Sequence, residues 1–425
     1  MLWTDRGGTN PGSEEHDLAG HVVQTVHAVG AGYSSDMHEV QFLGNFPDGP
    51  HYLLIGRYRR CCYNLTAHRG PASATIWDAV VQEVTPGGAL VWSWDAADHV
   101  DPLQEADPQW WSTIIAGRSP YDVFHMNSAA IVDSASLLVS LRFADAIYKI
   151  RYKTAVGDRA IAWKLGGSPR AESLKLTDPH LGVGFGGQHY ARTFSDPSDP
   201  AGAYVTLHDN GTGRGRAPRA VRYRIDESAK TATWTEQVTD AAVRAASCCG
   251  SARKLPQGDW VMSWGANPLV TELTPSGSRV FGITFSGAYS YRVDAILPGV
   301  LTRAALRSAM DSQTGAVAAS AAAAADAAAA DVAGAGDGDP EAPSADADDS
   351  SLPTDVQRGT PDPLETRVAY GPNPTSGALT FGYALARGGM VRIGIYDVAG
   401  RLRAELVRAF QPPGRYEVRW DARSL

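Results

Sequence analysis

The chain has no apolar stretch long enough to span a bilayer and no Lys/Arg-rich run of the kind that binds nucleic acid. Its net charge of −8 is a mild acidic excess that says little about partners. The first ten residues also lack the basic start and apolar core of a secretion signal. That absence is weak evidence about location, because the strand repeats described below predict that part of the fold precedes Met1.

Cysteine is scarce, and the four cysteines form two vicinal pairs, Cys61-Cys62 and Cys248-Cys249. Adjacent cysteines rarely both reach one metal ion, so neither pair predicts a zinc site. Both pairs border strands, and we predict that one cysteine of the first pair lies near one of the second. A bridge between the pairs would need an oxidising compartment. The alternatives are free thiols or strained vicinal bridges.

Helical periodicity is absent from every long segment, and short strand-like segments take its place up to about residue 300. They are rich in β-branched and aromatic residues and are broken by Gly, Pro, Asp and Asn. The clearest examples are residues 51–58, 89–94, 136–141, 146–152, 160–165 and 260–264. A strand, a Gly-containing turn and a strand that often carries Trp recur together. Repeats of about 40–50 residues with about four strands each are typical of propeller blades. The alternative is a β-sandwich.

Roughly four such units lie between Asp36 and Gly287, and residues 16–32 look like the tail of an earlier blade. A propeller protects its sheet edges by closing, so we predict that at least one N-terminal blade is missing. The first predicted domain is therefore an N-terminally incomplete β-propeller over residues 1–305. Residues 306–362, rich in Ala, Asp, Gly and Pro, predict a disordered linker. Residues 363–425 predict a small antiparallel β-sandwich that is incomplete at its C-terminus.

Four histidines stand near strand ends in successive units: His38, His99, His125 and His189. Because the innermost strands of a propeller face its central channel, residues at the same position of successive blades converge there. Asn127 lies two residues after His125, so on one strand the two side chains would face the same side. Arg142 ends another strand.

Metal binding would suit His and Asp, but Arg142 and Asn127 are poor neighbours for a cation. An anion site is favoured, because arginine presents a rigid fork that matches sulfate or phosphate oxygens. A neutral histidine can also act as a nucleophile in group transfer.

Several stretches, in order, carry a family resemblance: DMHEVQ, VVQEVTPGGALVWSWDAADHV, DVFHMNSAAIVDSASLLVSLRFADAIYKI, AIAWKLGG, FGGQHYAR, HDNG, GSARKLPQGDWVMSWG and SYR. Residues 17–299 resemble the bacterial and fungal arylsulfotransferase-type propellers. The resemblance implies a six-bladed propeller and an enzyme that moves a sulfo group between phenols through a sulfohistidine. It implies an aryl sulfate and a phenol acceptor as partners, and no nucleotide donor, cofactor or metal.

The resemblance also implies roles for individual residues. His189 matches the nucleophile. His38, His125, Asn127 and Arg142 match the sulfate-binding and acid/base positions, and His99 lies in a family motif with no clear role.

Two departures stand out. Tyr190 replaces the usual Asp after the nucleophile, and Phe143 replaces a polar Asn after the arginine. They favour the alternative of a non-catalytic extracellular propeller with an anion-binding channel. The presence of all five matched positions favours the enzyme, which is the function we predict.

Residues 371–420 resemble the FlgD-like immunoglobulin module and the C-terminal sorting domains of type-9 secretion, through GPNPTSG, IGIYDVAGR and GRYEVRWD. Either resemblance implies a non-catalytic domain of an exported protein that contacts secretion or cell-surface machinery. We therefore expect the protein to be periplasmic, at the cell surface or secreted.

Overall fold

The computed structural model describes residues 2–4, 12–17, 21–117, 119–285, 288–295, 305, 307–308, 367–370, 378–385, 389–396, 402–411 and 414–421. The chain divides into two compact units, Met1–Thr302 and Arg303–Leu425. The predicted linker, residues 306–362, lies outside the described residues apart from 307 and 308. The domain boundaries given above remain predictions.

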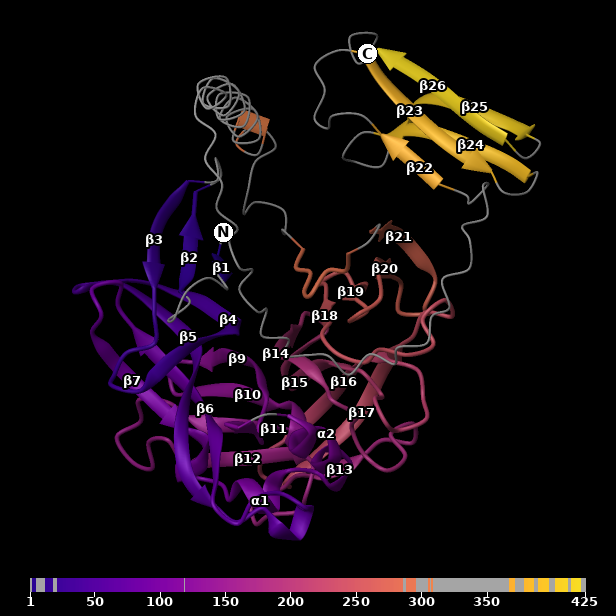
Figure 1. Cartoon of the computed structure of the whole chain (residues 1–425). Helices are drawn as coiled ribbons and strands as arrows, with labels where there is room; N and C mark the ends of the chain where they lie inside the picture. The colour runs from indigo at the N-terminus through magenta and orange to yellow at the C-terminus, as the bar shows by residue number, and fades with distance from the viewer. Residues whose placement is uncertain are drawn as a thin grey trace, which may run out of the picture. The chain divides into compact units, whose positions relative to one another are not determined.

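The described residues of the first unit form five sheets that follow one another along the chain (Figure 1). The first sheet contains β1 (Leu2–Thr4), β2 (Ser13–His16) and β3 (Val22–Val26). The second contains β4 (Tyr33–Phe46), β5 (Gly49–Tyr63), β6 (Ala74–Val84) and β7 (Leu90–Asp95), with β8 (Tyr121–Asp122) parallel to β6. The third contains β9 (Met126–Asp133), β10 (Ser136–Leu141), β11 (Ala146–Arg151) and β12 (Ile161–Gly166).

The last two sheets of this unit repeat the same up-and-down order. The fourth contains β14 (His189–Asp196), β15 (Asp199–Asp209), β16 (Arg219–Asp226) and β17 (Thr231–Val238), with β13 (Lys175–Thr177) parallel to β17. The fifth contains β18 (Ser251–Lys254), β19 (Trp260–Ser263), β20 (Leu269–Leu273) and β21 (Arg279–Thr284). Each strand pairs antiparallel with the next, because short Gly- and Asp-containing turns join them.

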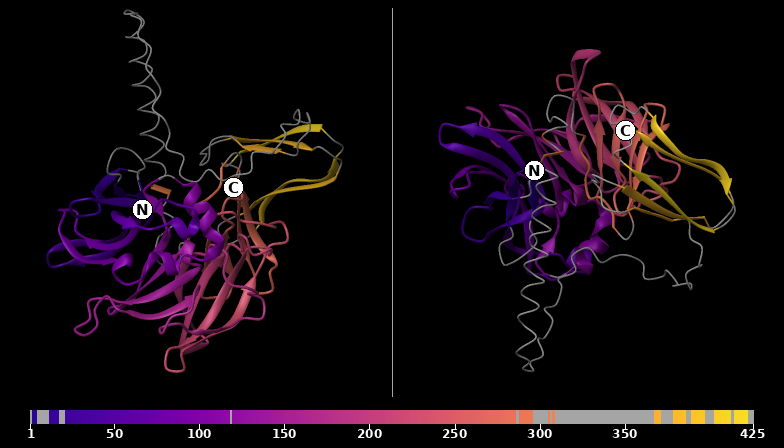
Figure 2. Two further views of the ribbon diagram at one scale, coloured as in Figure 1. Left: turned by 60° about the horizontal axis from the view of Figure 1, so that its bottom comes forward. Right: turned by 90° about the horizontal axis from the view of Figure 1, so that it is seen from above.

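The sheets stand side by side, as the blades of a propeller do (Figures 1 and 2). The first strands of successive sheets touch in order: β4 contacts β9, β9 contacts β14, and β14 contacts β18. The prediction of an all-β, propeller-like fold built from four-stranded repeats is therefore confirmed. These first strands carry the candidate residues His38, Asn127 and His189.

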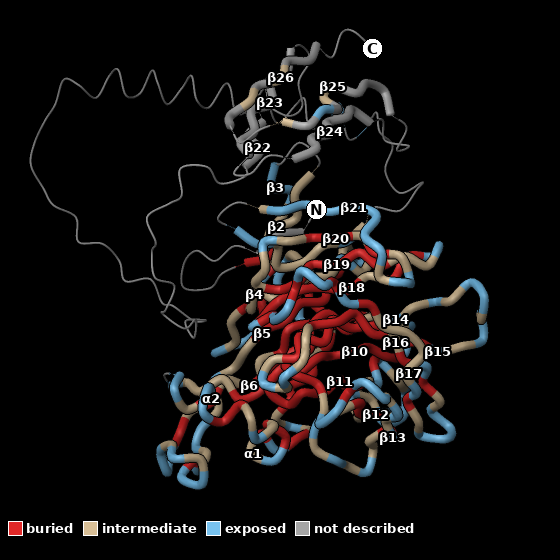
Figure 3. The backbone as a smooth tube through the Cα atoms, turned by 90° about the vertical axis from the view of Figure 1, so that its right-hand side faces the viewer, coloured by how far each residue is buried: buried red, intermediate tan, exposed pale blue. Residues whose placement is uncertain are grey.

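The hydrophobic core consists of clusters to which neighbouring sheets both contribute. The buried positions are coloured red in Figure 3. Trp94 of β7 belongs to the cluster between the second and third sheets, Trp163 of β12 to the next, and Trp260 of β19 to the last. Successive side chains of a strand point to opposite faces of its sheet, so one face of each sheet packs into such a cluster. The recurring Trp in the sequence repeat is thus a core residue.

Among the described residues up to 295, the α-helices are short and lie between β7 and β8: α1 (Pro102–Glu105) and α2 (Trp111–Ala116). Single 3-10 turns occupy residues 66–68, 96–98, 108–110 and 142–144. The side chain of Asp101 accepts a hydrogen bond from the Leu103 amide and so caps α1. Among the described residues, no helix is long and apolar enough to cross a membrane.

Residues 288–295 follow β21 and return to the first strands of the other sheets. Arg292 forms an ion pair with Glu39 of β4 at 2.7 Å. Its guanidinium also donates to the carbonyls of His38 (3.0 Å) and Asn127 (3.2 Å). The amide of Gly250, just before β18, donates to the Tyr291 carbonyl. This returning segment therefore joins three sheets at their first strands.

In the second unit, the described strands form two antiparallel sheets, as the alternating sequence predicts. One contains β22 (Arg367–Tyr370), β23 (Ala378–Leu385) and β26 (Gly414–Asp421), and the other contains β24 (Gly389–Tyr396) and β25 (Leu402–Gln411).

The predicted disulfide between the two cysteine pairs is wrong. The structure closes both pairs as vicinal bridges, Cys61–Cys62 and Cys248–Cys249. The first pair lies near the end of β5 in the second sheet, and the second lies in the turn before β18 of the fifth. A bridge between neighbouring residues needs no contact between these two sheets, whereas the predicted bridge would have required one.

Candidate functional site

Three of the four predicted histidines gather at the first strands. The rings of His38 on β4 and His125 just before β9 meet edge to face, with centroids 5.2 Å apart. The Tyr291 ring contacts His38 (5.7 Å) and His189, the first residue of β14 (6.3 Å). His99 is not part of this group. It follows β7, at the opposite edge of the sheet from β4, and stacks on Trp94 with ring centroids 5.3 Å apart.

His38 forms a close pair with Asp36. Its Nδ1 donates to Asp36 Oδ1 at 2.5 Å, and its amide donates to the same oxygen at 2.9 Å. Burial opposes the charged ring, but the charge of Asp36 outweighs it and raises the pKa of His38. Burial likewise opposes the Asp36 carboxylate, yet its contacts with His38 and the charge of Arg57 lower its pKa to about 2. This part of the site therefore favours a protonated imidazole.

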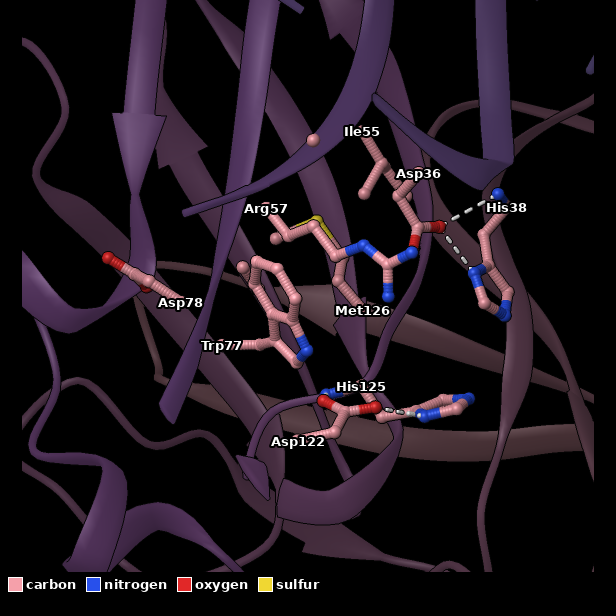
Figure 4. Close-up of a pocket in the computed structure, with 11 residues that line it drawn as sticks. Asp36, His38, Ile55, Arg57, Trp77, Asp78, Asp122, His125 and Met126 are labelled. Carbon is pink, nitrogen blue, oxygen red and sulfur yellow. Dashed lines mark hydrogen bonds and ion pairs between the residues drawn. The ribbon is translucent and has the colours of Figure 1, made fainter. Parts of the chain in front are cut away.

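His125 forms a second pair of the same kind, with Asp122 of β8 (Figure 4). Its Nδ1 donates to Asp122 Oδ2 at 2.6 Å, and its amide to Asp122 Oδ1 at 2.9 Å. His125 has a φ of 48° and precedes β9, so strand alternation begins only after it. The premise that His125 and Asn127 share one face of a strand is therefore wrong.

A pocket lies between these two pairs and is lined by Arg57 and Trp77 as well (Figure 4). The guanidinium carbon of Arg57 stands 4.9 Å from the centroid of the Trp77 ring. The carboxylates of Asp36 and Asp122 line the pocket together with the two imidazoles, so each of these carboxylates has a histidine partner close by. Such a balanced set can hold a polar substrate and exchange a proton with it.

His189 is buried, and both of its ring nitrogens are engaged. Nδ1 lies 2.8 Å from both the Gly187 carbonyl and Asn210 Oδ1, which are acceptors, so Nδ1 carries the proton. Nε2 accepts a hydrogen bond from the Cys249 amide at 3.1 Å. Burial and the positive charge of Arg142 hold the pKa of His189 well below its usual value. The ring is therefore neutral at pH 7, with its lone pair on Nε2.

Arg142 follows β10 and lies between this histidine and an aromatic surface. Its guanidinium carbon is 4.7 Å from the centroid of the Trp110 ring, and its Nη2 donates to the Ser247 carbonyl at 2.8 Å. Gly187 has a φ of 65°, and a Cβ there would lie 3.3 Å from Arg142 Nε and 3.1 Å from the Trp110 ring. A glycine is thus needed for the close approach of the chain to this arginine.

Asn127 is fully buried on β9. Its Nδ2 donates to the Gln188 carbonyl, next to His189, at 2.7 Å. Its Oδ1 has no hydrogen-bond partner among the described residues. The side-chain amide of Asn127 therefore positions the backbone just before His189, and its Oδ1 is left unpaired in the interior.

Comparison of the sequence with protein-family models identifies the group of proteins to which the chain belongs. A family model described as Arylsulfotransferase (ASST) matches residues 17–286, well over half of the chain. The chain belongs to the arylsulfotransferase family. The matched span contains His38, His125, Asn127, Arg142 and His189, and it ends before the C-terminal strands. The FlgD-like and sorting-domain resemblance of those strands stays a prediction.

Other comparisons add little. No curated protein matches the chain. A protein of unknown function from Bacteroides caccae is 12% identical over 49% of this chain and 55% of that chain, with a TM-score of 0.27. A putative 6-phosphogluconolactonase from Bacteroides fragilis is 9% identical over 67% of this chain and 66% of that chain, with a TM-score of 0.32. The chain thus spans about half of the first protein and just under two thirds of the second, at TM-scores too low to carry an argument.

The two departures from the arylsulfotransferase pattern have structural explanations. The Tyr190 hydroxyl donates to Asp294 at 2.6 Å, and guanidinium groups of Arg192 and Arg292 lie over its ring. Residue 190 therefore does not orient His189, because Asn210 does. Phe143 packs its ring against His125, with centroids 4.8 Å apart.

Sequence reasoning missed five residues of this candidate site. They are Asp36, Asp122, Asn210, Cys249 and Tyr291. The first two could have been found, because an aspartate stands two or three residues before each histidine, where a short turn brings the side chains together.

Proposed function

We propose that the protein transfers a sulfo group from a phenolic sulfate ester to a phenol through a sulfohistidine on His189. Membership of the arylsulfotransferase family supports an arylsulfotransferase-type function in general. The observation that carries the finer proposal is the neutral His189, whose Nδ1 carries the proton and whose Nε2 keeps its lone pair. That is the protonation state a histidine nucleophile needs.

In the first half-reaction, Nε2 of His189 forms a bond to the sulfur of the donor. The bond from sulfur to the phenolic oxygen breaks, and the oxygen leaves with the bonding electrons. Arg142 stabilises the sulfo oxygens, together with the second N–H of Asn127 Nδ2, whose first N–H is donated to the Gln188 carbonyl. His38 supplies the proton to the leaving oxygen, because Asp36 keeps its imidazole protonated to a higher pH than usual. His125, paired with Asp122, is the second candidate for this role.

The second half-reaction reverses these steps with a different phenol. The now neutral His38 accepts the proton of the acceptor hydroxyl, and the phenolic oxygen attacks the sulfur of sulfohistidine. The bond between Nε2 and sulfur breaks, and His189 returns to its neutral form. No nucleotide, cofactor or metal enters either step.

A second candidate function is a non-catalytic propeller whose channel binds anions. It is favoured by the hydrogen bond from the Cys249 amide, which occupies the Nε2 lone pair that must attack sulfur. Catalysis requires this hydrogen bond to be given up as the bond to sulfur forms. The second function requires no such change.

The test is to incubate the full chain with 4-nitrophenyl sulfate in the absence of an acceptor, and to locate any added sulfo group by mass spectrometry. The proposal expects the label on His189, no label in His189→Ala, and unchanged labelling in His99→Ala, a histidine outside the cluster. A label on another residue, or turnover that survives His189→Ala, would contradict the nucleophile. The absence of both a label and turnover with several donors would favour the anion-binding function.

We also propose that the protein acts outside the cytoplasm, as arylsulfotransferases generally do. A role for the C-terminal strands in secretion or surface attachment rests on sequence resemblance alone. Locating the full chain by cell fractionation, with and without residues 363–425, would test both statements.

A further inference from the structure

The turn that carries the Cys248–Cys249 disulfide touches both central residues of the proposed site. The Ser247 carbonyl accepts a hydrogen bond from Arg142 Nη2 at 2.8 Å. Two residues later, the Cys249 amide donates to Nε2 of His189 at 3.1 Å. One short piece of backbone therefore holds the guanidinium and the imidazole in a fixed relation.

The same turn also acts on the other side of the imidazole. The Cys249 carbonyl accepts from Nδ2 of Asn210 at 3.0 Å, and Oδ1 of Asn210 accepts from Nδ1 of His189. Nδ1 of His208 lies 3.2 Å from the same carbonyl. Cys249 thus sets the orientation of His189 directly at Nε2 and through Asn210 at Nδ1.

The backbone of this turn adopts a conformation that an L-residue disfavours. Cys249 has a φ of 64°, in the left-handed region, and Gly250 follows with a φ of 100°. A Cβ on Gly250 would come within 2.2 Å of His208 Nδ1, so the chain runs tightly against its neighbours. Cys248 and Cys249 are buried, at 8% and 4% exposure. The disulfide closes a small ring around the peptide bond between them, which limits the ways in which the turn can relax.

We propose that the Cys248–Cys249 disulfide is a positioning element of the site, which keeps the backbone of residues 247–249 where it orients His189 and Arg142. The inference rests on the proposed function. When two molecules of a thiol reductant open the bridge, the cysteines become two thiols, the reductant becomes its own disulfide, and the turn is released. A displacement of about 1 Å in a catalytic group costs roughly 100-fold in rate. We expect a loss of about 10- to 100-fold, mainly in kcat.

The chain offers a matched control in its other vicinal disulfide. Cys61 and Cys62 are exposed near the end of β5, and no hydrogen bond between described residues joins them to the site. The experiment compares Cys248→Ser/Cys249→Ser with Cys61→Ser/Cys62→Ser in the full chain. Serine is close to cysteine in size, so each pair of substitutions removes the bridge with little change in packing.

Two readouts are needed. The first is the turnover of 4-nitrophenyl sulfate with phenol as acceptor. The second is the pH titration of the His189 ring by NMR, with its signal assigned by comparison with His189→Gln. Because the Cys249 amide donates to Nε2 and so favours the neutral ring, its release raises the pKa of His189. We expect both readouts to change in the Cys248→Ser/Cys249→Ser protein and neither to change in the control.

The titration separates this inference from the proposed function, because it needs no turnover. A shifted titration in a protein that transfers no sulfo group would support the positioning role and contradict the transfer reaction. If the site double variant does not fold, the folded Cys61→Ser/Cys62→Ser protein retains one bridge, and its reduction and reoxidation give the same comparison. Unchanged turnover and an unchanged titration in the folded variant or the reduced protein would overturn the inference.

Discussion

Replacing Asp36 by asparagine should remove a measurable, pH-dependent part of the stability of the first unit. The contacts with His38 and the charge of Arg57 overcome burial and hold the pKa of Asp36 at about 2, against an ordinary value of 3.8. That difference corresponds to roughly 2–3 kcal/mol of stability while Asp36 is ionised in the folded protein. Asparagine keeps the shape of the protonated acid, so the variant should lose about that amount.

The directions of the two pKa shifts determine the pH at which Asp36→Asn destabilises the protein most. A lowered carboxyl pKa gives stability that is present above about pH 4 and is lost as the pH falls towards about 2. The raised pKa of His38 gives stability that is present below its unfolded value and is lost as the pH rises through the folded pKa. The destabilisation by Asp36→Asn should therefore be largest near pH 5–6 and shrink on both sides.

The assay is urea unfolding of both proteins from about pH 7 down to the lowest pH at which they stay folded. Asp48→Asn is the control, because Asp48 also pairs with a histidine, His51, but its side chain is 64% exposed. That substitution should change stability by less than about 0.5 kcal/mol at every pH. An Asp36→Asn effect that is equally large near pH 3, or absent near pH 5.5, would refute the reasoning about the buried pair.

Three further substitutions test other contacts of the site. Asn210→Ala removes the acceptor at Nδ1 of His189 and should lower 4-nitrophenyl sulfate turnover about 10- to 100-fold in steady-state kinetics; unchanged kcat would contradict its orienting role. Gly187 has a φ of 65°, and an added Cβ would lie 3.1 Å from the Trp110 ring, so Gly187→Ala should lower the free energy of unfolding in urea by about 1–3 kcal/mol. An unchanged free energy of unfolding would mean that the backbone relaxes freely. Tyr190→Phe should lose about 1 kcal/mol of stability with its hydroxyl hydrogen bond but keep turnover within about threefold, whereas a large loss of turnover would place residue 190 in the mechanism.

Strand positions could be predicted well from the sequence, because alternation and Gly turns are local signals. The segments 136–141 and 260–264 coincide with β10 and β19 to within one residue. The site was harder to predict. His99 looked equivalent to His38 because the sequence pattern placed both near a strand end, yet His38 lies within β4 and His99 follows β7. Sequence alone does not say whether a strand is the first or the last of its sheet. His125 broke the alternation rule through its positive φ, which no local pattern marked.

The cysteine pairing illustrates a different limit. Two pairs of thiols in separate sheets allow several bridges, and only the three-dimensional path of β5 and of the turn before β18 decides among them. The hydrogen bonds of Cys249 also depend on that path. Nothing in the sequence around Cys249 indicates that its amide donates a hydrogen bond to His189, sixty positions earlier.

The returning segment at residues 288–295 has a consequence for how the chain can fold and be cut. Arg292 meets Glu39, which is 253 positions away, so this contact forms only after nearly the whole first unit has been synthesised. Contacts of such long range are slow to form, because a large loop must close first. The family match ends at residue 286, before this segment begins. A fragment cut at that boundary would contain every strand described for the first unit and yet lack the contacts of Arg292 with β4 and β9.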